Sequence, residues 1–344
     1  MKTQNQNIGQ KIWAVIKGNP IVVMLAVASI AVGCTIDNFF SLSNLNDLAT
    51  NVTIRFLIAL GVSGCLITKG TDLSAGRQAA LAATLTGVMV QDITASTRLF
   101  TWLPEMNMWV VLLIVVGIGA VIGLLNGLII AYLKVPPFIA TLGIQTIVYG
   151  TNLIYTNAQP IGSFSEQYKD FFKIKLFDNL FSGIDPNFKG FSFYIIFAVI
   201  AGVLFWFIYN KTTHGKYMYA IGGNENAAEV SGVNVRGRLT AIYATAGVMY
   251  AIAGFLMAGK SGGASASMGV SYELEAIAGC TIGGVSTTGG IGTVGGILVG
   301  VLVFELLKII LLFLGVDPNY NYIAQGLVVI TAVAMDIRKY VAKK

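Results

Sequence analysis

Charged residues are scarce in this sequence. Asp, Glu, Lys and Arg make up only 11% of its 344 residues, whereas hydrophobic residues make up 55%. Soluble domains carry about 25% charged residues. Because so few charges cannot cover a protein of this length with a water-facing surface, the composition excludes a soluble globular protein. It predicts instead that lipid surrounds most of the chain.

Histidine and cysteine are scarce as well. His214 is the sole histidine, so a Ser-His-Asp triad has no partner near it and a His-rich metal site cannot form. Cys34, Cys65 and Cys280 lie in apolar stretches without a Cys-x-x-Cys spacing. We interpret them as buried small hydrophobic residues, not as a disulfide framework or a metal cluster. We therefore expect a protein that is not an enzyme and holds no cofactor or metal.

Long apolar runs, by contrast, are abundant. A helix needs about 17–25 mostly apolar residues to span a bilayer, and ten segments meet or approach this length. They predict an all-α, polytopic membrane protein with one transmembrane domain over residues 1–344. The ten expected spans are Pro20–Ile36, Thr50–Thr68, Leu73–Gln91, Met108–Tyr132, Pro137–Tyr155, Phe191–Asn210, Leu239–Ala258, Tyr272–Val285, Gly292–Leu314 and Asn321–Arg338.

Three of these spans have an unusual composition. Thr50–Thr68, Leu73–Gln91 and Tyr272–Val285 are rich in Gly, Ser and Thr, and the last of them is short. Irregular backbone is tolerated within a membrane only where protein or a water-filled cavity covers it. We therefore expect broken or re-entrant helices within residues 50–91 and 272–292.

The distribution of Lys and Arg orients the spans. With the N-terminus inside, the inner segments hold fourteen basic residues and the outer segments six, while Arg55 and Lys308 fall within spans. Cytoplasmic segments carry such an excess. We therefore expect both termini in the cytoplasm, with residues 1–19 as a cytoplasmic N-terminal segment. Residues 156–190 are expected to form a periplasmic loop, and residues 211–238 the largest cytoplasmic loop.

The two halves of the sequence resemble each other. Gly123–Gly143 is a Gly-rich apolar run, a Lys-Val-Pro-Pro break and a second apolar run, and Gly300–Val329 repeats this plan with Val-Asp-Pro-Asn at the break. The first break is expected inside and the second outside. This is typical of an inverted repeat whose substrate path lies between the halves.

Glycine-rich patterns are better explained by helix packing than by nucleotide binding. Gly254–Ser261 matches the P-loop pattern, but it ends an apolar span and its variable positions are apolar. Gly290–Gly295 imitates the dinucleotide fingerprint without a βαβ unit around it. Glycines at every fourth position let helix backbones approach closely in lipid. Two such series are Gly119, Gly123, Gly127 and Gly292, Gly296, Gly300.

Polar residues within the spans are candidates for a transport path. In Thr68–Gln78, Asp72 can cap the next helix and Arg77 is expected near the inner face, or this polar break lines the passage and offers partners to a polyol. Glu305 and Lys308 can pair at positions i and i+3, for structure or for function. The path candidates are Asp72, Ser74, Gln78, Asn126, Thr141, Gln145 and Glu305.

The largest inner loop contains a predicted short helix. Gly223 or Asn224 can cap its start, and Gly232 can end it. Ala227, Ala228 and Val230 would form a small apolar patch that faces the cytoplasm. Because such a helix has little core of its own to join, we expect a partner protein to cover it, although a plain surface helix stays an open alternative.

These residues resemble a known family. Tyr219–Asn234 closely resembles the coupling loop of monosaccharide permeases in ABC importers, the ribose, xylose and galactoside group. Other matching segments follow in the same order over nearly the whole chain, and Thr68–Gln78 with Val230–Val235 is most similar to the galactoside branch. These other segments are Gly70–Gly76, Pro137–Gly143, Tyr272–Ala278 and Gly283–Ser286.

The resemblance implies the non-catalytic permease subunit of an ATP-driven importer in a bacterial cytoplasmic (inner) membrane. It implies a homodimer of permeases, a cytoplasmic ABC ATPase that hydrolyses ATP, a periplasmic or lipid-anchored sugar-binding protein, and no nucleic acid. The cargo would be galactose, glucose or a methyl galactoside. A permease for ribose or xylose, or an ion-coupled secondary transporter, remains an alternative.

The resemblance also assigns the short helix. It implies that Gly223–Gly232 is a coupling helix seated in a cleft of the ATPase. Many ABC importers carry Glu-Ala-Ala-x3-Gly at this place, whereas Asn226 stands here in the acidic position. The departure argues against a salt bridge there but leaves the docking intact. The residues implied in docking are Gly223, Asn224, Glu225, Asn226, Ala227, Ala228, Val230 and Gly232.

Overall fold

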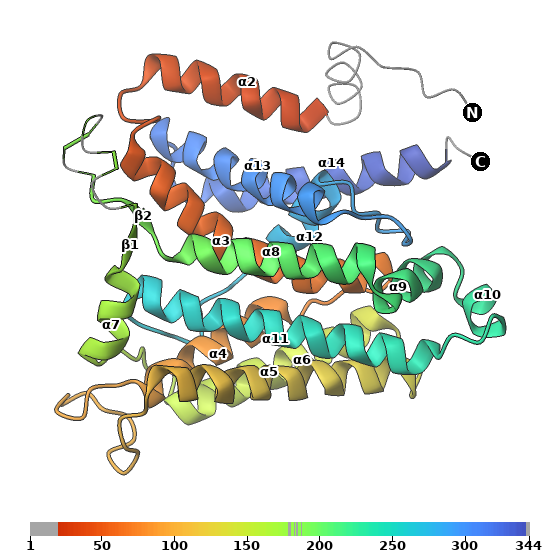
Figure 1. The fold of residues 1–344 in the computed structure, drawn as a ribbon, viewed down its shortest axis with the longest axis horizontal. Helices are drawn as coiled ribbons and strands as arrows, with labels where there is room; N and C mark the ends of the chain where they lie inside the picture. The colour runs from red at the N-terminus through yellow and green to blue at the C-terminus, as the bar shows by residue number, and fades with distance from the viewer. Residues whose placement is uncertain (1–19, 178–179, 182, 184, 187, 342–344) are drawn as a thin grey trace.

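The computed structural model describes residues 20–177, 180–181, 183, 185–186 and 188–341, which fold into a bundle of roughly parallel and antiparallel helices (Figure 1). The described elements are α2 (Pro20–Thr35), α3 (Leu42–Ile67), α4 (Ala75–Met89), α5 (Met108–Ala131), α6 (Pro137–Thr156), α7 (Glu166–Lys173), β1 (Lys175–Leu176), β2 (Phe191–Ser192), α8 (Tyr194–Lys211), α9 (Thr213–Gly223), α10 (Glu225–Val230), α11 (Val235–Ser261), α12 (Tyr272–Ile282), α13 (Val294–Phe313) and α14 (Tyr320–Val341). Each of the ten expected spans overlaps one of these helices.

Seven of the described helices are long and apolar enough to cross a membrane: α3, α5, α6, α8, α11, α13 and α14. The other three expected spans correspond to α2, α4 and α12, which have 16, 15 and 11 residues. The expectation of a broken second span was wrong, because α3 is continuous over 26 residues. Its Thr50, Thr53 and Ser63 hydroxyls donate to carbonyls of the same helix and therefore do not interrupt it.

α4 and α12 are short helices that each follow a non-helical segment. Residues 68–74 connect α3 to α4, and residues 262–271 connect α11 to α12. The start of α4 meets the segment that follows α11, since a Cβ atom at Gly76 would lie only 2.2 Å from the carbonyl oxygen of Gly269. Gly76 and Gly269 are buried. The N-terminal ends of the two short helices therefore meet where protein covers their irregular backbone, as lipid requires.

Two sets of four helices share one plan. α3 to α6 and α11 to α14 each run long, short, long and long. Each long first helix packs against the opposite set, α11 on α4 and α5, and α3 on α12 and α13. The α5–α6 connection lies at the end of the molecule that carries α9 and α10, and the α13–α14 connection lies at the opposite end (Figure 1). This is the relation that an inverted repeat produces.

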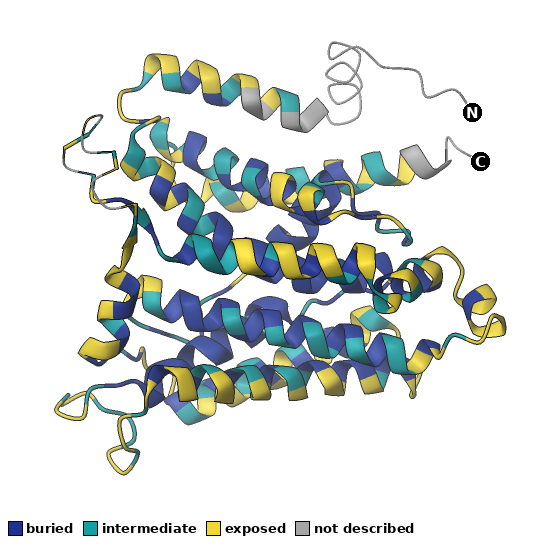
Figure 2. Cartoon of the chain, in the orientation of Figure 1, coloured by how far each residue is buried: buried dark blue, intermediate teal, exposed yellow. Residues whose placement is uncertain are grey.

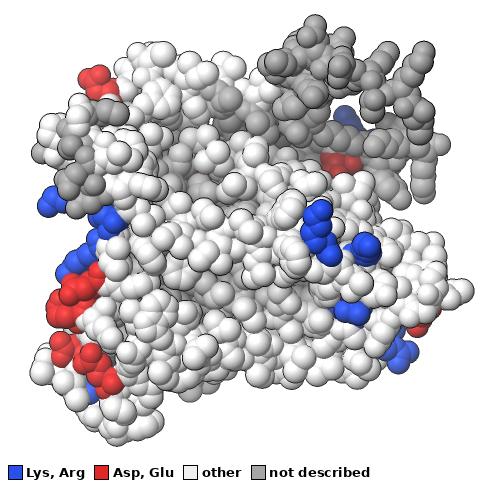
Figure 3. Space-filling view, viewed as in Figure 1, with Lys and Arg blue, Asp and Glu red and all other residues white. Residues whose placement is uncertain are grey.

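The charged side chains visible on one face lie near the two ends of the bundle, with an uncharged band between them (Figure 3). Within this band α8 and α5 expose large apolar side chains, among them Val203, Phe207 and Leu113 (Figure 2). Water would disfavour such a surface, whereas lipid tails match it. Cys34 on α2 is also exposed, contrary to our expectation, because α2 packs mainly on α13 and turns its other sides outward.

The expected long loop at residues 156–190 is partly folded. It contains α7, and β1 pairs antiparallel with β2, which follows the loop. Tyr168 is fully buried and its hydroxyl donates to the carbonyl oxygen of Phe255 at 2.6 Å. Phe172 packs against Tyr168 and Phe255. The segment therefore covers the end of α11 and does not project freely.

The glycine series on α5 lies against the backbone of α11. A Cβ atom at Gly123 would lie 2.2 Å from the carbonyl oxygen of Tyr243, and one at Gly119 would lie 2.4 Å from that of Gly247. The P-loop-like Gly254–Ser261 lies within α11 as regular helix. Close approach of helices is therefore the role of these glycines, as the four-residue spacing predicts.

We predict that Gly123→Leu destabilises the protein by about 1–3 kcal/mol or more, because its side chain would have to displace the α11 backbone. Gly117→Leu is the matched control, since Gly117 lies on the same helix and a Cβ atom there would meet no other atom within 4 Å. Thermal unfolding of the purified protein in detergent measures both. Equal midpoints for the two variants would contradict the packing described here.

Candidate functional site

Asp72 organises a buried polar cluster in the segment between α3 and α4. Its Oδ1 accepts a hydrogen bond from the Ser74 backbone N–H at 3.0 Å and another from the Ser74 hydroxyl. Its Oδ2 accepts from the Tyr250 hydroxyl at 3.1 Å. Asp72 and Ser74 are fully buried. Asp72 thus holds Ser74, the residue before α4, and links it to α11; the expected cap on the first turn of α4 was wrong, because Asp72 bonds no N–H within that helix.

Gln78 and Asn126 complete this Asp72 cluster. The Gln78 amide donates to the Ser74 hydroxyl oxygen at 2.8 Å, and the Asn126 amide donates to the same oxygen at 2.9 Å. The other amide atoms, Gln78 Oε1 and Asn126 Oδ1, are buried without a hydrogen-bond partner. Leaving an acceptor buried and unpaired costs about 1–3 kcal/mol. The cluster therefore holds two acceptors that a hydroxyl-bearing ligand could satisfy.

The remaining path candidates lie at different distances from this cluster. Thr141 on α6 is buried, and its hydroxyl oxygen accepts from the Leu73 backbone N–H at 3.1 Å. Gln145, one turn further along α6, is half-buried and takes part in none of the cluster's hydrogen bonds. Glu305 on α13 belongs to a second cluster. The structure therefore brings Asp72, Ser74, Gln78 and Asn126 together, with Thr141 beside them.

Arg77 does not lie at an inner surface as its sequence position suggested. Its guanidinium donates to the carbonyl oxygen of Ala266 at 3.1 Å and lies 4.1 Å from the ring centroid of Tyr149. Ala266 belongs to residues 262–271, the non-helical segment between α11 and α12. Arg77 thus joins α4, α6 and this segment. The contact could not be predicted, because it depends on the meeting of the start of α4 with this segment.

Glu305 and Lys308 belong to a larger charge cluster than their spacing indicated. Arg55 Nε lies 2.7 Å from Glu275 Oε2 and 2.9 Å from Glu305 Oε2. Lys308 Nζ lies 2.6 Å from Glu275 Oε1 and 3.7 Å from Glu305 Oε2. Gln325 on α14 donates to Glu275 Oε1 at 2.9 Å. We call these five residues the Arg55 cluster; it joins α3, α12, α13 and α14.

The Arg55 cluster is charge-balanced. Two cations and two carboxylates face one another near the middle of α3, and all four side chains are at most 14% exposed. Charges at this depth in a membrane are tolerated when they pair with one another. Of its members only Glu305 was predicted as a site residue, and Glu275 was missed. The sequence did contain a signal for this cluster, because charged residues of both signs fall within the second, eighth and ninth expected spans.

The two clusters occupy related positions in the two halves. Asp72-Leu-Ser-Ala75 precedes and starts α4, and Glu273-Leu-Glu-Ala276 starts α12. Glu273 is half-buried, and its Oε2 would lie 2.4 Å from a Cβ atom at Gly76. Glu273 was not among the predicted site residues. Its carboxylate nevertheless lies at the first turn of α4, close to the place where the short helices meet.

The predicted short helix is present as α10. The Asn224 side chain accepts from the Ala227 backbone N–H at 3.0 Å, and Gly232 has a φ of +86° just beyond the helix end. One detail was wrong: Ala228 is buried, while Ala227 is exposed and Val230 is 90% exposed. Ala228 packs against Ala131, Ile221, Val235 and Leu239 in a small apolar cluster. The sequence did not lead us to expect such a core for this helix.

We call α9 and α10 the foot; they lie at one end of the bundle (Figure 1). Where the two helices join, the foot contacts the end of α3. The Lys69 ammonium donates to the Gly223 carbonyl oxygen at 3.2 Å. The Gly290 backbone N–H donates to the Ile67 carbonyl oxygen at 2.8 Å, and the Tyr219 hydroxyl donates to that of Gly292 at 2.8 Å. The foot therefore contacts the backbone that leads directly into the Asp72 cluster.

The sequence profile of a family described as "branched-chain amino acid transport system / permease component" matches residues 44–333. This chain belongs to that permease family. The permease is 44% identical to the galactose/methyl galactoside import permease of Haemophilus influenzae over 341 residues, 97% of this chain and 98% of the relative.

Two further relatives are informative. The galactose/methyl galactoside import permease of Escherichia coli K12 is also 44% identical, over 95% of this chain and 96% of the relative. The ribose import permease of Haemophilus influenzae is 31% identical over 97% of this chain and 96% of the relative. No solved structure matches the permease. Family membership and the seven apolar helices together show a multi-pass membrane protein.

We predict that Glu275→Gln destabilises the permease by about 3–5 kcal/mol, because Arg55 and Lys308 would be left with one carboxylate between them. The substitution keeps the side-chain shape and so creates no cavity. Asp170→Asn is the matched control, since it breaks an exposed pair with Lys173 and should cost at most about 1 kcal/mol. Thermal unfolding in detergent measures both, and a Glu275→Gln midpoint no lower than that of the control would refute the role of the cluster.

Proposed function

We propose that this permease is the membrane subunit of an ATP-driven importer for galactose, glucose or a methyl galactoside. The observation that carries the proposal is the 44% identity to two galactose/methyl galactoside import permeases over nearly the whole chain, against 31% to a ribose import permease. The family description names branched-chain amino acids, but these relatives indicate a sugar. Ribose or xylose is the second candidate cargo.

The proposed topology places the foot in the cytoplasm of a bacterium, together with both chain termini and residues 1–19 and 211–238. Residues 156–190 would then face the periplasm, and residues 1–344 would form one transmembrane domain of about ten membrane-inserted segments. Support comes from α14, which ends at the same end of the bundle as α9 and α10 (Figure 1). The basic residues Lys211, Lys216 and Arg238 lie at that end too, as expected inside.

The proposed sugar site is the Asp72 cluster. A sugar hydroxyl can donate to Gln78 Oε1 and Asn126 Oδ1, the two acceptors that lack partners. Because Asp72 and Ser74 are fully buried, the cluster must open in another conformation for a sugar to reach it. Thr141 would hold the segment in place, and Gln145 would line its approach. Glu305, a path candidate by sequence, is better explained as a structural member of the Arg55 cluster.

A second permease copy is proposed to cover the side of the bundle formed by α4, α6 and the start of α12. Arg77, Gln145, Tyr149 and Glu273 are half-buried there. Lipid would disfavour these polar groups strongly. A homodimer would shield them and place the sugar path between two copies.

Transport would be driven through the foot. A cytoplasmic ATPase is proposed to grip α10 at its exposed residues, chiefly Ala227 and Val230, while Ala228 holds the helix onto the permease. Gly223, Asn224, Glu225, Asn226 and Gly232 are also exposed around it. Movement of the foot would reach the Asp72 cluster through Lys69. The partner would hydrolyse the ATP, and a periplasmic or lipid-anchored binding protein would deliver the sugar.

An ion-coupled secondary transporter is the competing function, and the buried charges of the Arg55 cluster are the observation that favours it. Those charges, however, balance and pair with one another. A coupling ion would need a carboxylate that is free to exchange partners, and Asp72, a buried carboxylate outside the Arg55 cluster, is held by Ser74 and Tyr250. ATP is therefore the better-supported energy source.

The decisive experiment is uptake of labelled galactose by vesicles that contain the permease, its ATPase and its sugar-binding protein. We expect uptake that requires ATP and continues when an ionophore collapses the ion gradients. Uptake that needs no ATPase and stops with the ionophore would establish the secondary transporter instead.

Val230→Arg tests the foot in the same assay. An arginine buried without a partner in the ATPase cleft should reduce uptake at least about tenfold, since such burial costs several kcal/mol. The amount of permease in the membrane should not change, because Val230 is 90% exposed in the permease alone. Val230→Ile, which stays apolar, is the matched control. Wild-type uptake by Val230→Arg would rule out docking at this residue.

A further inference from the structure

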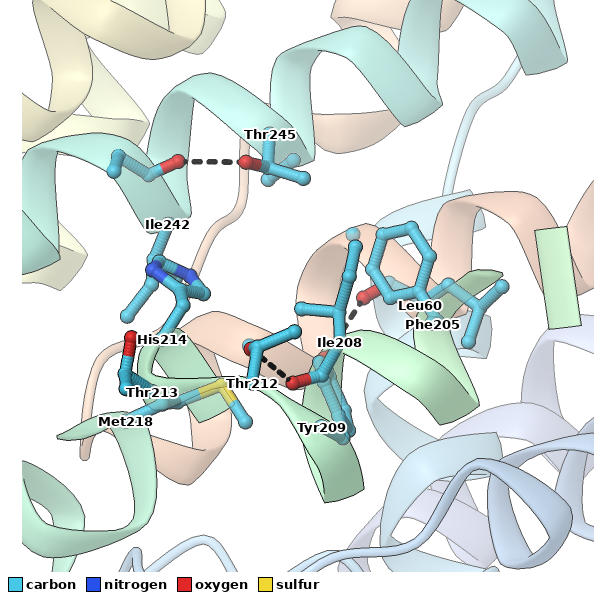
Figure 4. A pocket seen from close by; sticks show the side chains of 14 residues that line it. Leu60, Phe205, Ile208, Tyr209, Thr212, Thr213, His214, Met218, Ile242 and Thr245 are labelled. Atoms are coloured by element: carbon cyan, nitrogen blue, oxygen red, sulfur yellow. Dashed lines mark hydrogen bonds between the residues drawn. The ribbon is translucent and has the colours of Figure 1, made fainter. Parts of the chain in front are cut away.

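A pocket of about 350 Å³ lies between α3, α8, α9 and α11, away from the Asp72 cluster (Figure 4). Its apolar wall is formed by Leu60, Phe205, Ile208 and Ile242. His214, which belongs to α9, also lines the pocket. Its volume is within the range of small-molecule sites, about 300–1,000 Å³. Nothing in the proposed transport path uses this pocket.

Three of the four hydroxyl groups that line the pocket have partners, and that of Thr213 is the fourth. Thr212 donates to the Ile208 carbonyl oxygen at 2.6 Å and Thr245 to the Ala241 carbonyl oxygen at 2.8 Å, both drawn as dashed lines in Figure 4. Tyr209 shares a hydrogen bond of 2.7 Å with Ser63. Few donors remain for a sugar. An apolar ligand or part of a ligand therefore matches the interior of the pocket best.

The imidazole of His214 adds no charge to the pocket. Burial, together with the positive charge of nearby Arg238, holds the pKa of His214 below its usual range. The ring is thus neutral near pH 7. The Arg238 guanidinium lies 4.9 Å from the ring centroid of Tyr217 on α9, the helix that carries His214.

Three basic residues of the helices that line the pocket lie at the end of the bundle that carries the foot. Lys211 directly precedes the lining residue Thr212, and Lys216 lies on α9 between His214 and Met218, which both line it. Arg238 precedes the lining residue Ala241 by three positions on α11. The sequences of α8, α9 and α11 contain no Asp or Glu. Figure 3 shows basic side chains gathered over this end of the bundle.

We propose that the pocket binds an anionic phospholipid. One acyl chain would enter between α8 and α11, where Ile208, Ala241 and Thr245 are half-exposed, and the phosphate would lie among Lys211, Lys216 and Arg238. The arrangement follows the depth profile of a membrane, with an apolar cavity toward the bilayer centre and cations at the level of the headgroups. Charge complementarity selects an anionic over a zwitterionic lipid.

Such a lipid would act as a bridge in the permease. It would connect α8 and α9 to α11, and α9 leads directly into α10. An anionic lipid would therefore help to fix the position of the foot. The binding itself can be measured on the permease alone and does not depend on the proposed transport function.

Native mass spectrometry of the full-length purified permease tests the site. The probes are dioleoylphosphatidylglycerol and dioleoylphosphatidylcholine at equal concentrations. Each cation near an anionic lipid contributes about 1 kcal/mol, so we expect phosphatidylglycerol to bind at least about fivefold more tightly. Equal affinity for the two lipids would overturn the proposal.

Two kinds of variant locate the binding. Lys216→Glu with Arg238→Glu should remove the preference for phosphatidylglycerol, whereas Lys189→Glu, at an exposed lysine near the opposite end, should retain it. Thr245→Trp should fill the mouth of the pocket and weaken binding of phosphatidylglycerol, whereas Leu113→Trp, on the exposed side of α5, should not. Ala241→Phe blocks the same mouth should Thr245→Trp fail to fold. Wild-type binding in the pocket variants, or equal loss in the controls, would overturn the proposal.

Discussion

Lipid offers no hydrogen bonds, so each polar group within the bundle must find its partner inside the protein. This constraint explains the main features of the structure. The two short helices begin in the interior, where neighbouring helices cover the irregular backbone. The four charges around Arg55 balance one another across four helices. Some buried side-chain atoms of the described residues have no hydrogen-bond partner, among them Gln78 Oε1 and Asn126 Oδ1 of the Asp72 cluster.

The close packing that satisfies lipid also suits the proposed transmission of motion. Glycines bring α5 against α11, and Gly76 against Gly269, until backbone meets backbone. Such contacts leave little room for one element to move independently of the next. The foot is connected in the same way, because Lys69 binds the Gly223 carbonyl and lies just before the Asp72 cluster. We propose that a displacement of α10 reaches the Asp72 cluster through this contact.

Much of this architecture could be predicted from the sequence. Apolar length located ten segments that each overlap a described helix, seven of them long and apolar enough to cross a membrane. The four-residue glycine spacing predicted the contact of α5 with α11. The failures concern partners from distant helices, such as Arg55 with Glu275 or Arg77 with Ala266, which spacing along one chain does not encode. Ala228 was misplaced for the same reason, because the core that buries it comes from α5, α9 and α11.

The central claim is that sugar passes the polar meeting point of the two short helices. Substituted-cysteine labelling tests it most directly, in a permease with Cys34, Cys65 and Cys280 replaced and reconstituted with its partners. During ATP-driven transport, Gln145→Cys should react with a membrane-impermeant thiol reagent, and galactose should slow the reaction, whereas the lipid-facing Leu113→Cys should stay unreactive. If Gln145→Cys is as unreactive as Leu113→Cys throughout the transport cycle, the path lies elsewhere.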